Sequence, residues 1–198
     1  MFCRQVVACK RRILQLVGDQ CYLKHAPHLT LYASCFSPET DLLTPVREVA
    51  GRLEVPTVDI RDWHVFEGDR LTGGNTLACD VPVAARDSFR KIQQEMVAAL
   101  APLRDPEASR SHYESAWDGL SREERVGVKG FGFPFVGRLW RPHVTIASIV
   151  PSAWQTVWSA LADTPLKALV GFPCLTLQVV EQVQSVPVER FALQRPEG

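Results

Sequence analysis

The sequence has no excess of charge of either sign and no long apolar run. Its 198 residues include 22 Lys and Arg against 22 Asp and Glu, so the formal net charge is 0. A neutral chain lacks the positive field with which proteins bind long duplex DNA. No apolar stretch approaches the roughly 20 residues that cross a membrane, and the first residues do not form the apolar segment of a signal peptide. We therefore expect no partner of either kind, duplex DNA or membrane.

Several catalytic motifs are also absent. The sequence contains no H-E-x-x-H, no cysteine pair with the spacing of zinc ligands, and no G-x-S-x-G turn. These absences argue against a zinc hydrolase and against a serine hydrolase of the α/β type. We expect no metal and no cofactor.

The cysteines are scattered rather than paired. With no secretory signal and no C-x-x-C, they predict buried free thiols in a reducing cytoplasm. They are Cys3, Cys9, Cys21, Cys35, Cys79 and Cys174.

What the chain does contain is one short motif twice. Pro27-His28-Leu29-Thr30-Leu31 returns as Pro142-His143-Val144-Thr145-Ile146. Alternation of aliphatic and polar residues is typical of a half-buried strand. Side chains two positions apart on a strand leave the same face, so each copy would present an imidazole and a hydroxyl together. We predict strands over about 27–36 and 138–149, facing one cleft.

The remaining pattern predicts an α+β protein. We expect one domain over 1–198 with two lobes, two antiparallel sheets related by a pseudo-twofold, helices outside and a central cleft. Lys10, Arg11 and Arg12 should lie on the polar face of the first helix. Residues 105–129 predict a loop or short helix. The glycine-rich residues 127–137 predict either a loop that closely approaches the site or a plain turn with an aromatic plug. Helices are predicted over 5–17, 40–53, 84–103 and 152–168, with further strands over 58–66, 76–81, 173–180 and 188–193.

Two histidines and two threonines suit cleavage of a phosphodiester. The reaction needs a base for the attacking oxygen, an acid for the leaving oxygen, and donors for the phosphoryl oxygens. Imidazole titrates near pH 6.5, so one ring can be neutral while the other is protonated. Hydroxyls beside them can donate hydrogen bonds to phosphate. This scheme assigns acid–base roles to His28 and His143 and phosphate binding to Thr30 and Thr145.

The paired His-x-Thr motifs resemble those of the two-histidine phosphoesterase superfamily. That superfamily includes 2'-5' RNA ligase-like proteins and 2',3'-cyclic nucleotide phosphodiesterases. The resemblance implies a bilobal fold, metal-independent chemistry on 2',3'-cyclic phosphates or 2'-5' linkages, and a central role for His28, Thr30, His143 and Thr145.

Further residues are expected to bind the substrate. Arg141 lies two positions before His143 and should share its face, where it can contact phosphate. Tyr32 continues the face of the first motif and can stack on a base. Additional candidates are Arg138, Lys129, Phe135 and Trp140. The other histidines, His25, His64 and His112, are interpreted as loop, structural and exposed residues, respectively.

These observations predict a monomeric, cytoplasmic enzyme that opens a 2',3'-cyclic phosphate in a nucleotide or RNA end. Alternatives within the same chemistry are a 2'-5' phosphodiesterase or RNA ligase and a cyclic oligonucleotide hydrolase. A different class is a non-catalytic protein that binds a nucleotide or an RNA end. The insertion over about 103–129 could cap the cleft in each case.

Overall fold

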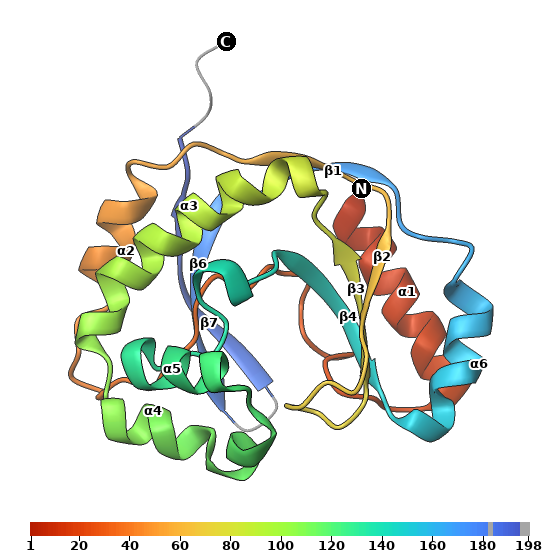
Figure 1. Ribbon diagram of the computed structural model, residues 1–198. Coiled ribbons are helices and arrows are strands. Elements are labelled where there is room, and N and C mark those ends of the chain that lie inside the picture. The colour runs from red at the N-terminus through yellow and green to blue at the C-terminus, as the bar shows by residue number, and fades with distance from the viewer. Residues whose placement is uncertain (182–183, 195–198) are drawn as a thin grey trace.

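The computed structural model describes residues 1–181 and 184–194 (Figure 1). It is an α+β protein with antiparallel sheets, as predicted. In chain order its elements are α1 (Phe2–Val17), α2 (Leu43–Ala50), β1 (Thr57–Ile60), β2 (Trp63–Phe66), β3 (Asn75–Asp80), α3 (Val83–Leu100), η1 (Ala101–Leu103), α4 (Pro106–His112), η2 (Glu114–Gly119), α5 (Arg122–Phe131), η3 (Gly137–Leu139), β4 (His143–Ile149), α6 (Pro151–Leu161), β5 (Ala168–Gly171), β6 (Cys174–Glu181) and β7 (Gln184–Ala192).

The strands of the described residues form three sheets. β2, β3 and β4 make an antiparallel sheet in that order, β1 pairs with β5, and β6 pairs with β7. The predicted strand over 58–66 is therefore two strands, because the chain leaves one sheet after Ile60 and enters another at Trp63. β5 was not predicted, and the helix expected over 152–168 ends at Leu161.

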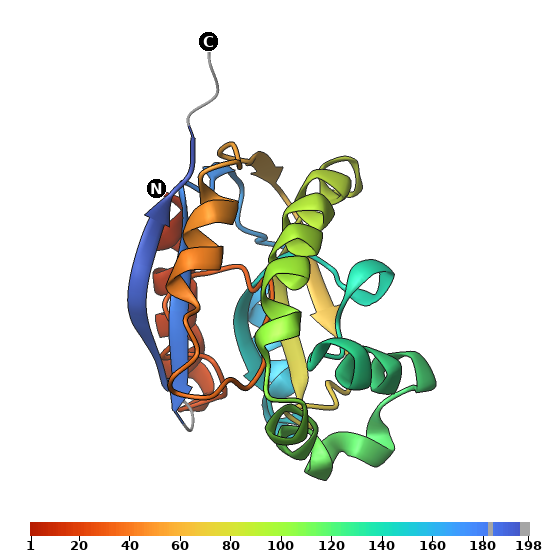
Figure 2. The same cartoon turned by 90° about the vertical axis from the view of Figure 1, so that its left-hand side faces the viewer.

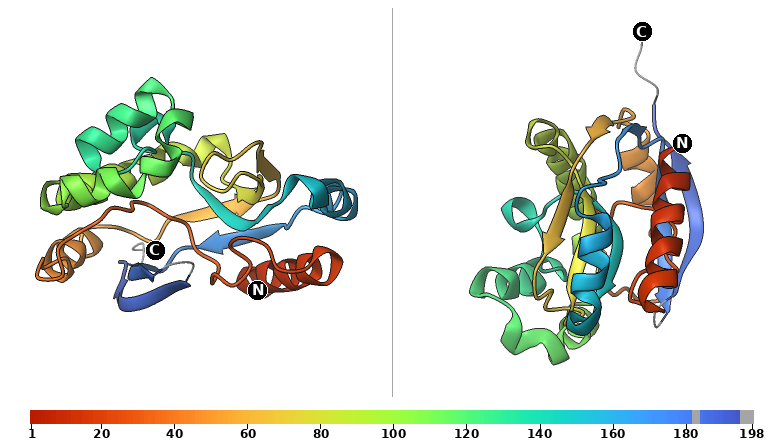
Figure 3. Two further views of the ribbon diagram at one scale, coloured as in Figure 1. Left: turned by 90° about the horizontal axis from the view of Figure 1, so that it is seen from below. Right: turned by 90° about the vertical axis from the view of Figure 1, so that its right-hand side faces the viewer.

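Two hydrophobic clusters fill the interior. The first joins α1, β1 to β4 and α6, and the second joins α2, α3, β6 and β7. Figure 1 shows α1 and α6 side by side at one end of the molecule, and α2 and α3 side by side at the other. In Figures 2 and 3 the β6–β7 hairpin lies on the opposite side of the molecule from α4 and α5. Each cluster combines elements from both halves of the chain.

The insertion is more helical than predicted. Asp105 caps α4 by accepting hydrogen bonds from two backbone amides of its first turn, and Ser121 with Glu124 forms a capping box at the start of α5. α5 continues through Gly127, where an added Cβ would lie 2.8 Å from the carbonyl oxygen of Pro134. The close approach predicted for 127–137 is thus between α5 and its own following loop.

Two expectations about solvent exposure need correction. Lys10 is 5% exposed, although it was predicted on the polar face of the first helix. All six cysteines lie in the described part of the chain and are free, but only Cys9 and Cys79 are buried. Within that same part, no helix is both long and apolar enough to cross a membrane.

Candidate active site

The second motif lies on β4, at the centre of the first cluster. Val144 and Ile146 point into the core, so His143 and Thr145 point to the opposite face of the sheet. β4 starts at His143 rather than at 138, because Gly137–Leu139 forms a short 3-10 helix. In the pairing with β3, His143 lies opposite Asp80 and Thr145 lies opposite Ala78. The strand therefore presents an imidazole and a hydroxyl together, as predicted.

The first motif does not lie on a strand. Residues 27–36 are all described, and none of them belongs to a strand or a helix. The prediction of a strand here is wrong because a strand needs a hydrogen-bonding partner, and β3 occupies one edge of β4 while the other carries only the single bridge between Cys21 and Ser148.

Side chains from other segments hold this first motif in place. The indole Nε1 of Trp140 donates a hydrogen bond of 3.0 Å to the carbonyl oxygen of Thr30. The Tyr32 hydroxyl donates a 2.5 Å bond to the carbonyl oxygen of Phe131. Further along, the amide of Asp105 bonds to the carbonyl of Cys35 at 2.9 Å. Residues 30–35 are thus attached to the segment that leads into β4 and to the insertion.

The turn before the first motif is fixed by a buried lysine. Nζ of Lys10 donates to the carbonyl oxygens of Tyr22, at 2.5 Å, and His25, at 2.9 Å. Burial lowers the pKa of the Lys10 amine to about 8. The amide of Ser148 donates to the carbonyl of Cys21 at 3.0 Å, so the same turn is also tied to β4. Helix α1 and β4 together place the start of the first motif.

The two catalytic candidates make the same hydrogen bond. Nδ1 of His28 bonds to the carbonyl oxygen of Ala26, and Nδ1 of His143 bonds to that of Arg141, each at 2.7 Å. A carbonyl can only accept, so each Nδ1 carries the proton. In both rings this leaves Nε2 free to accept a proton when neutral or to donate one when charged.

Burial is the main cause that lowers the pKa of both rings. For His28, the neighbouring His25 and Lys10 also lower the pKa, while the bond to Ala26 raises it. For His143, the positive charge of His28 lowers the pKa further. The ring of His28 therefore lies near enough for its charge to act on His143.

Asp80 balances part of the positive charge beside His143. Arg141 binds its carboxylate through Nε at 3.0 Å and through a terminal nitrogen at 2.6 Å, and Arg86 contacts it at 2.9 Å. Burial works to raise the pKa of Asp80, but the bond with Arg141 and the two guanidinium charges hold it below its usual range. Arg141 is 33% exposed at its side chain, so it keeps a surface that a phosphate can reach.

The other substrate-binding candidates lie in different surroundings. Arg138 is exposed and pairs with Glu123. Lys129 lies on α5 with Nζ 5.9 Å from the ring centre of Trp117. Phe135 is half-buried, whereas Trp140 is 4% exposed and contributes through packing and its bond to Thr30. The structure therefore brings Arg141 to the second motif and places Arg138 and Lys129 toward the insertion.

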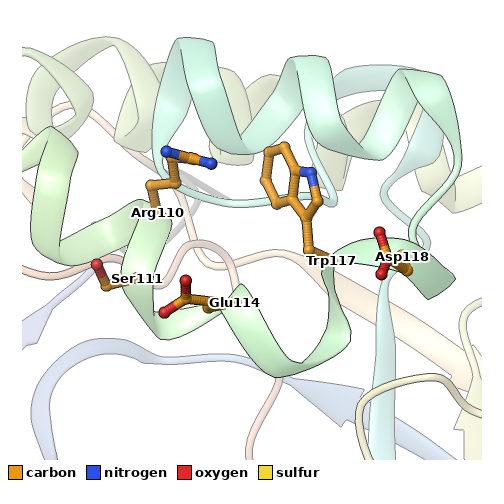
Figure 4. Close-up of a pocket in the computed structure, with 5 residues that line it drawn as sticks. All are labelled: Arg110, Ser111, Glu114, Trp117 and Asp118. Carbon is orange, nitrogen blue, oxygen red and sulfur yellow. The ribbon is translucent and has the colours of Figure 1, made fainter.

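The insertion contains a cavity of about 250 Å³, shown in Figure 4. It is lined by Arg110, Ser111, Glu114, Trp117 and Asp118. Arg110 and Trp117 approach each other, with the guanidinium carbon 5.4 Å from the ring centre. None of the lining residues belongs to either motif.

His64, interpreted from the sequence as structural, lies in the same row of the sheet as Thr145. On β2 it lies opposite Ala78, which in turn lies opposite Thr145 on β4. Burial and then the charge of Arg141 lower the pKa of His64, and His143 acts in the same direction. In the sequence, His64 and Phe66 are spaced like His and Thr in the two motifs. This spacing alone does not show which strand lies beside them, because that depends on the register of the sheet. His112 is exposed in α4, as predicted, and His25 lies in the turn.

Among the described residues, no group of three or more His, Cys, Asp or Glu side chains is arranged to hold a metal ion.

In comparisons with known proteins, the family model of the 2'-5' RNA ligase superfamily matches residues 3–184. This range includes both motifs, the insertion and His64. No curated protein matches the chain.

Proposed function

Because the chain belongs to the 2'-5' RNA ligase superfamily, we propose that it is a phosphodiesterase acting on nucleotide or RNA-end phosphodiesters, and that it opens 2',3'-cyclic phosphates. Membership supports a phosphoesterase activity of the two-histidine type. The observation that carries the proposal is the matched pair of imidazoles. His28 and His143 have the same Nδ1 bond and the same available Nε2, and the charge of His28 acts on the pKa of His143.

In this mechanism the two rings divide the proton transfers. Nε2 of the neutral ring takes a proton from water as the water oxygen bonds to phosphorus. Nε2 of the protonated ring gives its proton to the ribose oxygen as the bond from phosphorus to that oxygen breaks. The roles of His28 and His143 exchange with substrate orientation, which also decides between a 2'- and a 3'-phosphate product.

The remaining groups bind the phosphate. The hydroxyls of Thr30 and Thr145 donate to the non-bridging oxygens, where charge builds up in the transition state. Arg141, already oriented by two bonds to Asp80, adds positive charge at the same place. Tyr32 lies next to the first motif, and its hydroxyl is bound to Phe131, so only its ring can face a base.

Two other functions fit the same four residues. A 2'-5' phosphodiesterase, RNA ligase or cyclic oligonucleotide hydrolase would use the rings in the same way on a different ester. A protein that binds a nucleotide or an RNA end without cleaving it would use the phosphate contacts alone. Turnover separates the second alternative from the proposal, and product analysis separates the first.

The test is a chromatographic assay of 2',3'-cyclic nucleotides and short 2'-5'-linked oligomers in excess chelator. Wild type, His28→Ala and His143→Ala are compared. We expect ring opening by wild type that survives the chelator and is lost in both variants. Near-wild-type turnover by either variant would exclude the mechanism. Binding without turnover across the panel would favour the non-catalytic alternative.

A further inference from the structure

The third strand of the central sheet extends the face of the second motif. His64, Ala78 and Thr145 lie in one row across β2, β3 and β4. On β2, Trp63 and Val65 pack against the core, so His64 and Phe66 point to the same side of the sheet as His143 and Thr145. Ala78 lies between them and has the smallest side chain that keeps a Cβ. Ala78 is fully buried under its neighbours, and the half-buried His64 and Thr145 lie on either side of it.

Phe66 connects His64 to the catalytic ring. Its ring centre lies 4.4 Å from that of His64 and 4.7 Å from that of His143. All three side chains are half-buried. An apolar ring in contact with both imidazoles restricts their orientation and keeps both at the accessible face of the sheet.

This part of the molecule carries more positive than negative charge. Beside His64, the two guanidinium groups of Arg141 and Arg86 share the single carboxylate of Asp80. The whole chain has a formal net charge of 0, so the excess is a local feature. His64 lies two strand spacings from Thr145, roughly 10 Å across the sheet, so it can contact a group other than the phosphate held at Thr145.

We propose that His64 binds a second phosphoryl group of the substrate, adjacent to the phosphate held by Thr30 and Thr145. This assignment rests on the proposed function, since it takes the scissile phosphate to lie at the two motifs. His64 becomes protonated as that second anion binds and donates a charge-assisted hydrogen bond to it. The preferred substrates are then nucleotides or oligonucleotides with a further phosphate beyond the ester that is cut.

The experiment compares two ligands that the enzyme cannot hydrolyse at a cyclic ester, adenosine 3'-monophosphate and adenosine 3',5'-bisphosphate. Calorimetric titrations near pH 6 give both dissociation constants for wild type, His64→Gln and the control His112→Gln, which changes an exposed histidine on α4. We expect wild type and the control to bind the bisphosphate at least about 10-fold more tightly than the monophosphate. In His64→Gln this ratio should fall close to 1 while monophosphate affinity stays unchanged.

Steady-state kinetics provide a second test of the assignment of His64. With a 2',3'-cyclic nucleotide that also carries a 5'-phosphate, His64→Gln should raise KM about 10-fold and leave kcat within about twofold of wild type, because a uniform binding contact is removed.

The outcomes separate the two hypotheses. Equal weakening of both ligands in His64→Gln would show that the side chain only supports Phe66, and the assignment would fall while the proposed function stood. If His64→Gln still binds the bisphosphate about 10-fold more tightly than the monophosphate, the assignment of His64 is likewise wrong while the proposed function stands. If wild type binds neither ligand and opens no 2',3'-cyclic phosphate in the chromatographic assay, the proposed function fails, and the second phosphate site fails with it.

Discussion

His143 and Thr145 lie on a strand that shares its backbone hydrogen bonds with β3, whereas His28 and Thr30 lie in a segment outside any helix or strand that is held by side chains. The second motif is fixed by a regular sheet inside one hydrophobic cluster. Leu31 and Tyr32, beside the first motif, pack against both clusters. The same short sequence therefore acquires its position in two ways, once by strand pairing and once by contacts with distant residues.

Replacing either catalytic imidazole should give the largest decrease in kcat, and the decrease should be similar for the two motifs. His28→Asn and His143→Asn are each expected to lower kcat by roughly 10²–10⁴-fold, the usual contribution of a proton-transfer group. The double variant should be little worse than either single variant, because the rings act as one unit. Rates of product formation by chromatography measure this, and a loss confined to one of the two singles would contradict the shared mechanism.

Lys10→Met should distinguish the motifs, because only the first depends on this side chain. The half-buried carbonyl groups of Tyr22 and His25 lose their donor, at a cost of about 1–3 kcal/mol in the free energy of unfolding. Urea unfolding measures the loss, and kcat/KM should fall as the turn before His28 loosens. Lys91→Met, an exposed change on α3, is the control and should alter neither quantity. Unchanged stability in Lys10→Met would show that water replaces the amine.

Two tryptophans form a matched pair for the same comparison. Nε1 of Trp140 bonds to the carbonyl of Thr30, and Nε1 of Trp63 bonds to the carbonyl of Leu161 at 2.9 Å. Each Trp→Phe change should lower the free energy of unfolding by about 1–3 kcal/mol. Only Trp140→Phe should also reduce kcat/KM, by several-fold, because it alone releases the first motif. If both variants reduce kcat/KM equally, the reduction comes from the lower stability of the whole protein and not from release of the first motif.

The smallest effect is a shift of the pH profile. Burial lowers the pKa of both His28 and His143 from the ordinary 6.5, so each ring loses its proton at lower pH in the folded protein. The form with one neutral and one charged ring is then most abundant below pH 6.5, and a bell-shaped kcat/KM profile should reach its maximum there. A maximum above pH 7.5 would contradict the role of burial.

The same shifts affect stability. Below pH 6.5 the unfolded chain binds more protons than the folded one, so the free energy of unfolding should decrease as the pH falls from 6.5 through the folded pKa values. In His143→Asn this decrease should be smaller. Urea unfolding at several pH values measures it.

The sequence predicted the α+β class and the strand of the second motif, because these follow from local alternation of apolar and polar residues. It did not predict that residues 27–36 would remain unpaired, since pairing depends on which sheet edges are free. Lys10 was assigned to solvent because its sequence neighbours are charged, whereas its acceptors lie 12 and 15 residues away. The place of His64 in the row of Thr145 could not be predicted, because it depends on the register of three strands.

The bridge between Cys21 and Ser148 has a consequence for how the protein is made. The turn that introduces the first motif closes onto β4, and the indole that holds Thr30 is at position 140. During synthesis from the N-terminus the ribosome must therefore complete β4 before the first motif has its supports. Such long loops are slow to close. Nascent chains should acquire the active arrangement late, after the secondary structure of α1 has formed.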